Sequence, residues 1–404
     1  MNLLKTINTI SIRSTFILIN QISHLISIPI LVTRLQVETF GQVAFCFVLI
    51  QFSWLLCDWG IQNYTIEKWG KMKKRNQQNM LIISIFCLNL FLAISISIVI
   101  FIFKLLNFIN IPNLYFTYTL LSIIFGGIIP YWFFLVKKNL QEILIITLIS
   151  RMIYLALIYF FVIKDEYAYI AISAQALSMF IIGLYSFYII FSKYYYKFLK
   201  VKFNNVIFIC KNSFPFLVNI FTFNQINVLW ALGLSFFGSL ESIALYNIAD
   251  QIYKAGISFS KVVSQSIRIH FINSSFFDKK NTFQFFCFFY FIISILLIII
   301  AGSFISNYFP EDYKKSINLI QIIIVICFLQ SIINLIHYPL LADIKGHKWL
   351  NQITKLSLIA HLLGVLFWII FFSESLSLSI IFLVVVFIHF IFYLINLKKF
   401  FYVL

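Results

Sequence analysis

The sequence predicts an all-α polytopic membrane protein with about twelve spanning helices. Of its 404 residues, 62% are hydrophobic and only 11% are charged, and the mean hydropathy is +0.98. A soluble protein of this size cannot bury so much apolar surface, so lipid must surround most of it. Long apolar runs alternate with short linkers from Thr15 to Ile395, and Lys and Arg gather on every second linker.

Twelve apolar segments reach the length of about 20 residues that a spanning helix needs. They cover approximately residues 15–35, 41–63, 80–103, 114–136, 141–163, 168–191, 206–233, 240–267, 283–308, 317–337, 350–372 and 376–397. The first is expected to remain as a membrane helix, because Asn20, Gln21 and His24 interrupt it and no small-residue cleavage site follows.

The distribution of basic residues predicts the orientation. Most Lys and Arg lie at the N-terminus, at the C-terminus and after the even-numbered segments, as in Lys68 to Arg75 and Lys193 to Lys211. Loops rich in basic residues stay on the cytoplasmic side, so both termini are expected in the cytoplasm and the chain in a bacterial inner membrane. The net charge of +17 then reflects topology and contact with anionic lipid, and nucleic acid is not an expected partner.

A short internal similarity suggests two repeated lobes. Glu38 precedes the small residue Gly41 by three positions, and Glu241 precedes Ala244 by the same spacing, 203 residues later. That offset is about half the chain and coincides with a division into six plus six segments. We therefore expect an N-terminal lobe of residues 1–192 with helices 1–6, a basic cytoplasmic linker of residues 193–211 and a C-terminal lobe of residues 212–404 with helices 7–12.

Four short segments carry a resemblance to a known family. They are Ile28-Pro-Ile-Leu-Val-Thr-Arg-Leu-Gln-Val-Glu-Thr-Phe-Gly41, Leu56-Cys-Asp-Trp-Gly60, Pro130-Tyr-Trp-Phe-Phe134 and Leu245-Tyr-Asn-Ile-Ala-Asp-Gln-Ile252. Together they resemble the O-antigen flippases (Wzx type), in the polysaccharide-transporter branch of the MATE-like (MOP) exporter superfamily. The resemblance implies two six-helix lobes with alternating access. It also implies an undecaprenyl-diphosphate-linked oligosaccharide as substrate, moved from the cytoplasmic to the periplasmic leaflet. Polymerase and chain-length regulator would be possible assembly partners, and O-antigen, capsule and exopolysaccharide stay open as products.

The eighth segment contains the densest group of intramembrane charges. Its members Asp250, Lys254, Lys261, Gln265 and Arg268 recur at helical spacing and share one stripe. A lysine at mid-membrane costs about 2.5–3.5 kcal/mol, so the stripe should face water, a partner or the substrate. In the alternative, Asp250 pairs with Lys254 for structure and Lys261 reaches the cytoplasmic surface.

Arg151 is the expected cation of the N-terminal lobe. It divides the fifth segment into two halves, neither of which is long enough to span, so its guanidinium should lie within the bilayer. A guanidinium binds phosphate oxygens through two parallel hydrogen bonds, which suits a diphosphate headgroup. The alternative is a shorter helix that begins near Ile149, with Arg151 at its cytoplasmic end.

Further polar residues are candidates for a glycan path or for ion coupling. Asn20 and His24 in the first segment and Asn227 in the seventh can bind sugar hydroxyls, but amides also join helices in lipid, and His24 can be a helix contact or a proton relay. Asp58 is a candidate coupling carboxylate, with helix capping or pairing with Lys68 as the alternative. No cofactor or metal is expected, and H⁺ or Na⁺ coupling is left open.

Other function classes fit the sequence less well. An O-antigen polymerase would need chemistry on a large extracytoplasmic loop, whereas every outward linker here is about ten residues or shorter. Phosphate-loop and metal-site motifs are absent from the sequence, so we do not expect an enzyme. A multidrug antiporter of the MATE type would need an acidic cavity for cationic drugs, whereas the intramembrane charges here are mostly positive.

Overall fold

The computed structural model describes residues 2–72, 74–137, 139–194, 196, 202–223, 226–272, 276–340 and 344–395. In this part every regular element is a helix. The chain divides into two compact units, one formed by Gln42–Val228 and the other by Met1–Gly41 with Leu229–Leu404. The all-α polytopic fold predicted from the sequence is confirmed.

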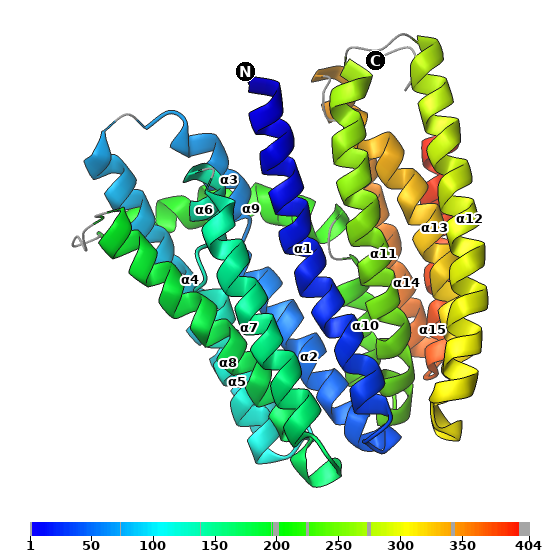
Figure 1. Ribbon diagram of the computed structural model, residues 1–404. Helices are drawn as coiled ribbons and strands as arrows, with labels where there is room; N and C mark the ends of the chain where they lie inside the picture. The colour runs from blue at the N-terminus through cyan, green and yellow to red at the C-terminus, as the bar shows by residue number, and fades with distance from the viewer. Residues whose placement is uncertain are drawn as a thin grey trace. The chain divides into compact units, whose positions relative to one another are not determined.

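The unit Gln42–Val228 consists of the helices that follow the first span. They are α2 (Val37–Asp58), α3 (Ile61–Trp69), α4 (Arg75–Leu105), α5 (Asn113–Gly127), α6 (Tyr131–Lys137), α7 (Leu140–Phe161), α8 (Tyr169–Tyr188) and α9 (Phe203–Phe223). Helix α8 packs between α5 and α7, and α4 packs on α5, so these four run as neighbours (Figure 1). The shorter α3 packs on α6 and α9.

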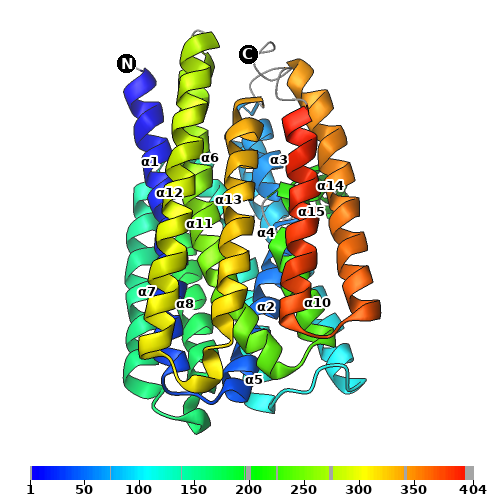
Figure 2. The same ribbon diagram turned by 90° about the vertical axis from the view of Figure 1, so that its right-hand side faces the viewer.

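The other unit combines the first helix with the C-terminal helices. They are α1 (Asn2–Val32), α10 (Ile226–Phe237, its larger part), α11 (Leu240–Ile272), α12 (Phe276–Tyr308), α13 (Ser316–Leu340), α14 (Ile344–Phe371) and α15 (Ser375–Ile395). Helices α12, α13, α15 and α14 stand side by side in that order (Figure 2), and α11 packs along α13 and α1. The sequence assigned the first span to lobe 1–192, and that lobe boundary stays a prediction.

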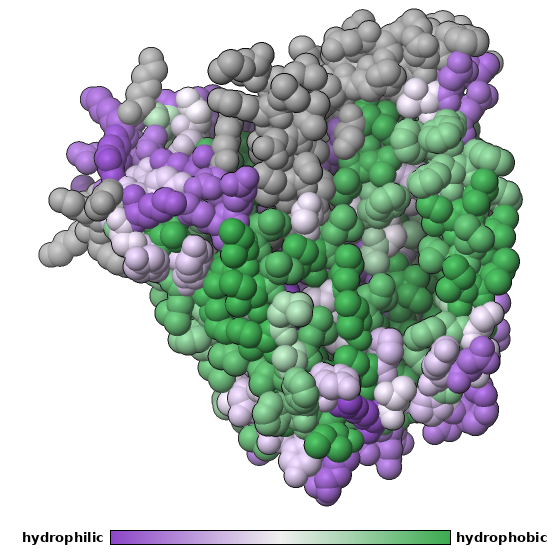
Figure 3. Space-filling view, viewed as in Figure 1, coloured by the Kyte–Doolittle hydropathy of each residue, from purple (hydrophilic) through white to green (hydrophobic). Residues whose placement is uncertain are grey.

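Most of the predicted spans appear as long apolar helices. In the described part, eight helices are long and apolar enough to cross a membrane, and shorter apolar stretches occur at Leu18–Val32, Asn227–Phe237 and Lys355–Phe371. The most apolar window of the helix Lys280–Tyr308 is only 6% buried. Figure 3 shows the corresponding apolar surface along α12, with hydrophilic residues at its two ends. Such a surface needs lipid around it.

Two predicted spans are interrupted within the described residues. The second breaks at Trp59 and Gly60, which have φ angles of 45° and 74° and so end α2. The fourth breaks before α6, where Pro130 has no N–H to continue the α5 hydrogen bonds. The seventh, predicted as one helix over 206–233, is helical as α9 and α10 on either side of residues 224–225, which lie outside the described residues. Periodicity alone therefore gave the positions of these spans but missed their breaks.

The two segments of the suspected repeat begin helices. Glu38 lies in the first turn of α2 and Glu241 in the first turn of α11, where a carboxylate interacts favourably with the helix dipole. A Cβ atom at Gly41 would collide with the backbone carbonyl of Leu240, so the two helix starts touch at a position that needs glycine. The duplication itself stays a prediction.

Candidate functional site

Helix α11 carries a buried ion pair. The ammonium of Lys254 contacts the carboxylate of Asp250 one turn earlier, and the two side chains are only 9% and 1% exposed. Because removing two charges from water is costly, each partner compensates the other here. The i,i+4 pairing of Asp250 with Lys254, given above as the alternative, is present. Whether the polar stripe also binds a ligand stays a prediction.

The remaining members of the polar stripe continue along the same face. At about 100° per residue, Lys261 and Gln265 lie within about 60° of Asp250 around the helix axis, and both are half-buried. The side chain of Arg268 lies outside the described residues. The described part of α11 thus has one cationic and amide-rich face.

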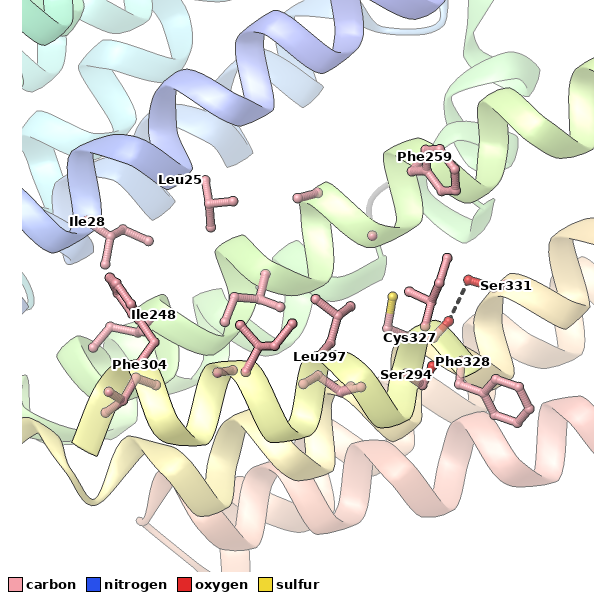
Figure 4. A pocket seen from close by; sticks show the side chains of 18 of the residues that line it. Leu25, Ile28, Ile248, Phe259, Ser294, Leu297, Phe304, Cys327, Phe328 and Ser331 are labelled. Carbon is pink, nitrogen blue, oxygen red and sulfur yellow. Dashed lines mark hydrogen bonds between the residues drawn. The ribbon is translucent and has the colours of Figure 1, made fainter. Parts of the chain in front are cut away.

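The opposite face of α11 borders an apolar cavity. This cavity has a volume of about 550 Å³ and is lined by residues of α1, α11, α12 and α13 (Figure 4). Its lining residues on α11 are Ile248, Ile252, Ala255, Gly256 and Phe259. By the same helical angle, these residues centre on the side of α11 opposite Asp250 and Lys254. The volume falls in the range of typical ligand pockets, about 300–1,000 Å³.

The two serine hydroxyl groups of the cavity wall are already bonded within their own helices. Ser294 Oγ donates to Tyr290 O at 2.8 Å, and Ser331 Oγ donates to Cys327 O at 2.7 Å. Figure 4 shows Ser331 bonded within α13 beside the apolar side chains Leu297 and Phe328. The cavity therefore offers its occupant a hydrocarbon surface. Sequence reasoning missed it, because apolar residues on four helices give no signal that separates a cavity wall from a packed core.

Helix α1 contributes both polar and apolar residues next to this cavity. Leu25, Ile28 and Pro29 line it. Asn20 and His24 lie just before them on α1 and are half-buried. Asn227, the candidate on α10, is 4% exposed. Asn20 and His24 thus lie on α1 and Asn227 lies on α10, and each of the three residues interacts with neighbouring groups.

In the unit Gln42–Val228, Arg151 lies within a helix. Helix α7 begins at Leu140, so the shorter helix beginning near Ile149 is wrong. The side chain is 3% exposed, and its Nη1 donates to Gln175 Oε1 of α8 at 2.8 Å. Its guanidinium carbon also lies 5.8 Å from the centre of the Tyr154 ring. The guanidinium therefore links α7 to α8.

Asp58 belongs to the joint between α2 and α3. Asp58 is the last residue of α2, and α3 begins three residues later with Gly60 at its N-cap position. The neighbouring Trp59 donates from Nε1 to Cys210 O at 3.1 Å, and a Cβ at Gly60 would lie 2.5 Å from Ser213 O. The motif Leu56–Gly60 thus joins α2, α3 and α9. Helix capping and ion coupling both stay predictions for Asp58.

The motif Pro130–Phe134 also builds a packed joint. Phe133 is fully buried and its ring lies 5.3 Å from that of Tyr194 and 5.8 Å from that of Tyr196. Lys137, one turn later, places its ammonium 5.1 Å from the centres of both the Trp69 and Tyr196 rings. Aromatic faces attract a cation at this range. These aromatic residues therefore hold Lys137 at the end of the bundle.

Comparison with known proteins gives a family and a fold. The family described as "Polysaccharide biosynthesis protein" matches residues 7–267, well over half of the chain. No curated protein matches the sequence. Among solved structures, the lipid II flippase MurJ in an inward closed conformation is similar with a TM-score of 0.73 and 16% identity, covering 98% of this chain and 89% of that chain.

Two other similar structures are transporters of the MOP superfamily. An inward-facing multidrug resistance transporter of the MATE family has a TM-score of 0.69 and 11% identity, covering 95% of each chain. A transporter from Pyrococcus furiosus, with a binding pocket of reversed polarity, has a TM-score of 0.57 and 12% identity, covering 97% of this chain and 96% of that chain. At these identities the likeness establishes the MATE-like fold.

Proposed function

Because the chain belongs to the polysaccharide biosynthesis protein family, we propose that it is a flippase for a lipid-linked oligosaccharide. The substrate is an undecaprenyl-diphosphate-linked glycan such as an O-antigen repeat unit. Alternating access carries it from the cytoplasmic to the periplasmic leaflet of a bacterial inner membrane, with both chain ends in the cytoplasm. The proposal is supported by the fold shared with a protein named as a lipid II flippase.

The observation that carries the proposal is the two-sided character of α11. One face has the buried Asp250–Lys254 pair and, further along, Lys261, and the opposite face borders a hydrocarbon-lined cavity. A lipid diphosphate has the matching two parts, a strongly anionic headgroup and a long apolar chain. A passive scaffold has no need for either feature.

Lys254 and Lys261 are the proposed contacts for the diphosphate. Ammonium groups bind phosphate oxygens through charge-assisted hydrogen bonds. In the empty state Asp250 compensates Lys254, so a headgroup must bring enough negative charge to replace that partner. The pair therefore favours a multiply charged diphosphate over a neutral lipid.

The apolar cavity is the proposed place for part of the isoprenoid chain. Its two serine hydroxyl groups are bonded within their own helices, and a largely apolar cavity of about 550 Å³ inside a membrane protein is filled most favourably by hydrocarbon. Gly256 borders it where a Cβ would lie 2.5 Å from Cys327 Sγ, so close packing of α11 on α13 forms one wall.

The other sequence-derived residues remain part of the proposal with narrower roles. Asn20, His24 and Asn227 are proposed to contact sugar hydroxyls along the path. Arg151 is proposed to meet the diphosphate when the α7–α8 contact through Gln175 opens, and Asp58 is proposed as a coupling carboxylate. A multidrug antiporter is the alternative, and the lysines of α11 argue against it because they repel cationic drugs.

Reconstituted vesicles can test the function directly. Purified protein is placed in vesicles with a fluorescent undecaprenyl-diphosphate oligosaccharide, and the fraction open to an added glycosidase is followed with time. Lys254→Ala should lower the initial rate by about ten- to a hundredfold, because a hydrogen bond to a charged group contributes about 1.5–3 kcal/mol. Lys254→Arg should retain most of the rate.

The matched control is Lys314→Ala, which removes a half-exposed ammonium of the same unit that pairs with Glu311. It should leave the rate unchanged. Absence of flipping by the wild-type protein, with export of a cationic dye instead, would replace this function by the antiporter.

The cavity is tested by filling it. Ala255→Phe places a ring in the apolar cavity and should slow a full-length isoprenoid substrate more than a short-chain analogue. Ser303→Phe adds the same ring at an exposed position of α12 and serves as control. Equal slowing by both variants would exclude the cavity from substrate binding.

A further inference from the structure

A second polar group lies inside the unit of α1 and α10–α15, away from the α11 stripe. Its members come from α10, α13, α14 and α15, and none exceeds 6% exposure. We call it the histidine cluster, and it consists of Trp230, His337, Ser357, His361, His389 and Tyr393. Burying three imidazoles among apolar side chains costs free energy, which suggests that the cluster has a functional role.

Hydrogen bonds join the cluster in three pairs. Trp230 Nε1 donates to His361 Nδ1 at 3.1 Å. Since an indole N–H can only donate, Nδ1 of His361 is the accepting nitrogen. His389 Nδ1 lies 3.2 Å from Ser357 Oγ, and His337 Nδ1 lies 3.1 Å from the hydroxyl of Tyr393. Each imidazole therefore has one nitrogen held by a neutral partner.

Ring contacts connect the pairs into one chain. The centres of the His361 and His389 rings are 6.4 Å apart, and those of His389 and Tyr393 are 5.2 Å apart. His389 Nε2 is buried and has no hydrogen-bond partner in the part of the chain that the structure describes. A buried nitrogen of this kind is unusual in a native protein and is available to a proton or to a water molecule.

The chain runs from a helix end toward the helix interior. His337 lies near the last residue of α13, Leu340, and Tyr393 lies near the last residue of α15, Ile395. His389 is one turn further in, and His361 lies within the second half of α14. A proton entering at this end of the unit would meet Tyr393 and His337 first and His361 last.

We propose that the histidine cluster is a proton-binding site that couples proton uptake to the transport cycle. Histidine changes charge near physiological pH, and an imidazolium among these neutral partners would favour an arrangement of α10, α14 and α15 that admits water. The proton enters through the His337–Tyr393 pair and is shared between His389 and His361. The site stands by itself, whereas its coupling to transport rests on the proposed flippase function.

The coupling has a physical route to α11. Phe382 stacks on Trp230 at 5.0 Å and contacts His361 at 5.7 Å, and its ring lies 6.0 Å from that of Tyr253. Tyr253 is the residue before Lys254. A shift of the Trp230–His361 pair would therefore move the side of α11 next to the proposed headgroup contact.

Few other ionisable groups face the cluster. Tyr253 of α11 reaches the cluster through Phe382. The other ionisable residues on the described parts of the neighbouring helices include the Asp250–Lys254 pair and Lys261 of α11, Cys327 of α13 and the exposed Lys355 of α14. Helices α10 and α15 contribute no further ionisable side chain within their described bounds. The three histidines are therefore the side chains of this region whose ordinary pKa lies closest to physiological pH.

Proton uptake can be counted without any substrate. Purified wild-type protein and variants are titrated in lightly buffered detergent solution between about pH 8 and 5, and the difference curve gives the protons bound. His389→Gln and His361→Gln should each remove about one proton or less, since the two rings share it. The control Trp368→Phe alters a fully buried indole on the same α14 that donates to Glu374 O, outside the cluster.

Three outcomes decide the site. Loss of uptake in both histidine variants, with normal uptake in Trp368→Phe and monodisperse protein throughout, supports it. Uptake equal to wild type in His389→Gln and His361→Gln overturns it. Uptake or release that appears only with added Zn²⁺ also overturns it, because the cluster would then be a metal site.

Vesicles with an imposed pH gradient then test the coupling. The flipping rate of the wild-type protein should change severalfold with the pH gradient, whereas the flipping rate of the His389→Gln variant should not depend on it. Equal gradient dependence in the two proteins overturns the coupling. The wild-type protein could fail to flip any lipid-linked glycan and still take up more protons than the histidine variants. That result would exclude the flippase function and support the proton-binding site.

Discussion

Buried polar groups have different surroundings in the unit Gln42–Val228 and around α11. In the unit Gln42–Val228, the recognisable sequence motifs form closed joints, with Gly60 against α9 and Lys137 against aromatic rings. Around α11, a buried ion pair lies on the face opposite an apolar cavity. The two motifs in this unit thus maintain its fold, whereas the two motifs on α1 and α11 contribute residues to the cavity wall and to the ion pair.

The largest expected effect is a loss of stability when the Asp250–Lys254 pair is broken. Asp250→Asn leaves the ammonium of Lys254 buried without its carboxylate, which should destabilise the unit by about 3–5 kcal/mol. The double variant Asp250→Asn/Lys254→Met should recover most of that stability, because no charge remains buried. Thermal unfolding in detergent measures both.

The same double variant should remain inactive in the vesicle assay. Recovery of flipping together with stability would mean that the pair serves only packing, and the headgroup contact would then have to lie elsewhere.

The second prediction tests the joint between α2, α3 and α9. Gly60→Ala should destabilise the protein by about 1–3 kcal/mol or more, because residue 60 has a φ of 74° and its new Cβ would lie 2.5 Å from Ser213 O. The matched control is Gly70→Ala at the end of α3, where nothing lies within 4 Å of the new Cβ. A similar loss of stability in both variants would contradict the assigned contact.

Sequence reasoning reached some of these features and missed others for physical reasons. Helical periodicity placed the spans and the α11 stripe, because side-chain spacing along one helix is fixed by the 3.6-residue turn. It also placed Arg151 within a helix, because the flanking halves were too short to span alone. The breaks at Gly60 and before α6 depend on backbone angles that average hydropathy does not register.

The cavity and the histidine cluster depend on contacts between helices. His337, His361 and His389 are far apart in the sequence and each looks like an isolated polar residue in an apolar run. Only packing brings them together with Trp230. The same holds for the cavity, whose walls come from α1, α11, α12 and α13.

The third prediction concerns the guanidinium geometry of Arg151. Arg151→Lys keeps the charge but loses the planar group that donates to Gln175, so flipping should fall by about three- to tenfold, as expected for a loss of about 0.5–1.5 kcal/mol. The variant Gln175→Leu removes only the acceptor and serves as comparison. If both variants lose stability but keep the flipping rate per folded molecule, Arg151 acts as a helix contact alone.

The smallest expected effect concerns the aromatic joint around Lys137. Lys137→Gln removes a cation held 5.1 Å from Trp69 and Tyr196 and 5.4 Å from Tyr194, which should cost about 0.5–1 kcal/mol of unfolding free energy. Lys71→Gln is the control, because its ammonium is 69% exposed and pairs only with Glu67 at 3.3 Å. A surface pair of that kind contributes little, about 0.2–0.5 kcal/mol.

Flipping by Lys137→Gln should match wild type once corrected for the amount of folded protein, because this joint lies at the end of the α6 helix and holds α3 and α6 together. Lys137→Arg should keep the stability, since a guanidinium also stacks on aromatic faces. If Lys137→Gln lowered the flipping rate and left the free energy of unfolding unchanged, the aromatic joint around Lys137 would have a role in transport. That result would remove the contrast between closed joints in one unit and ligand features on α11.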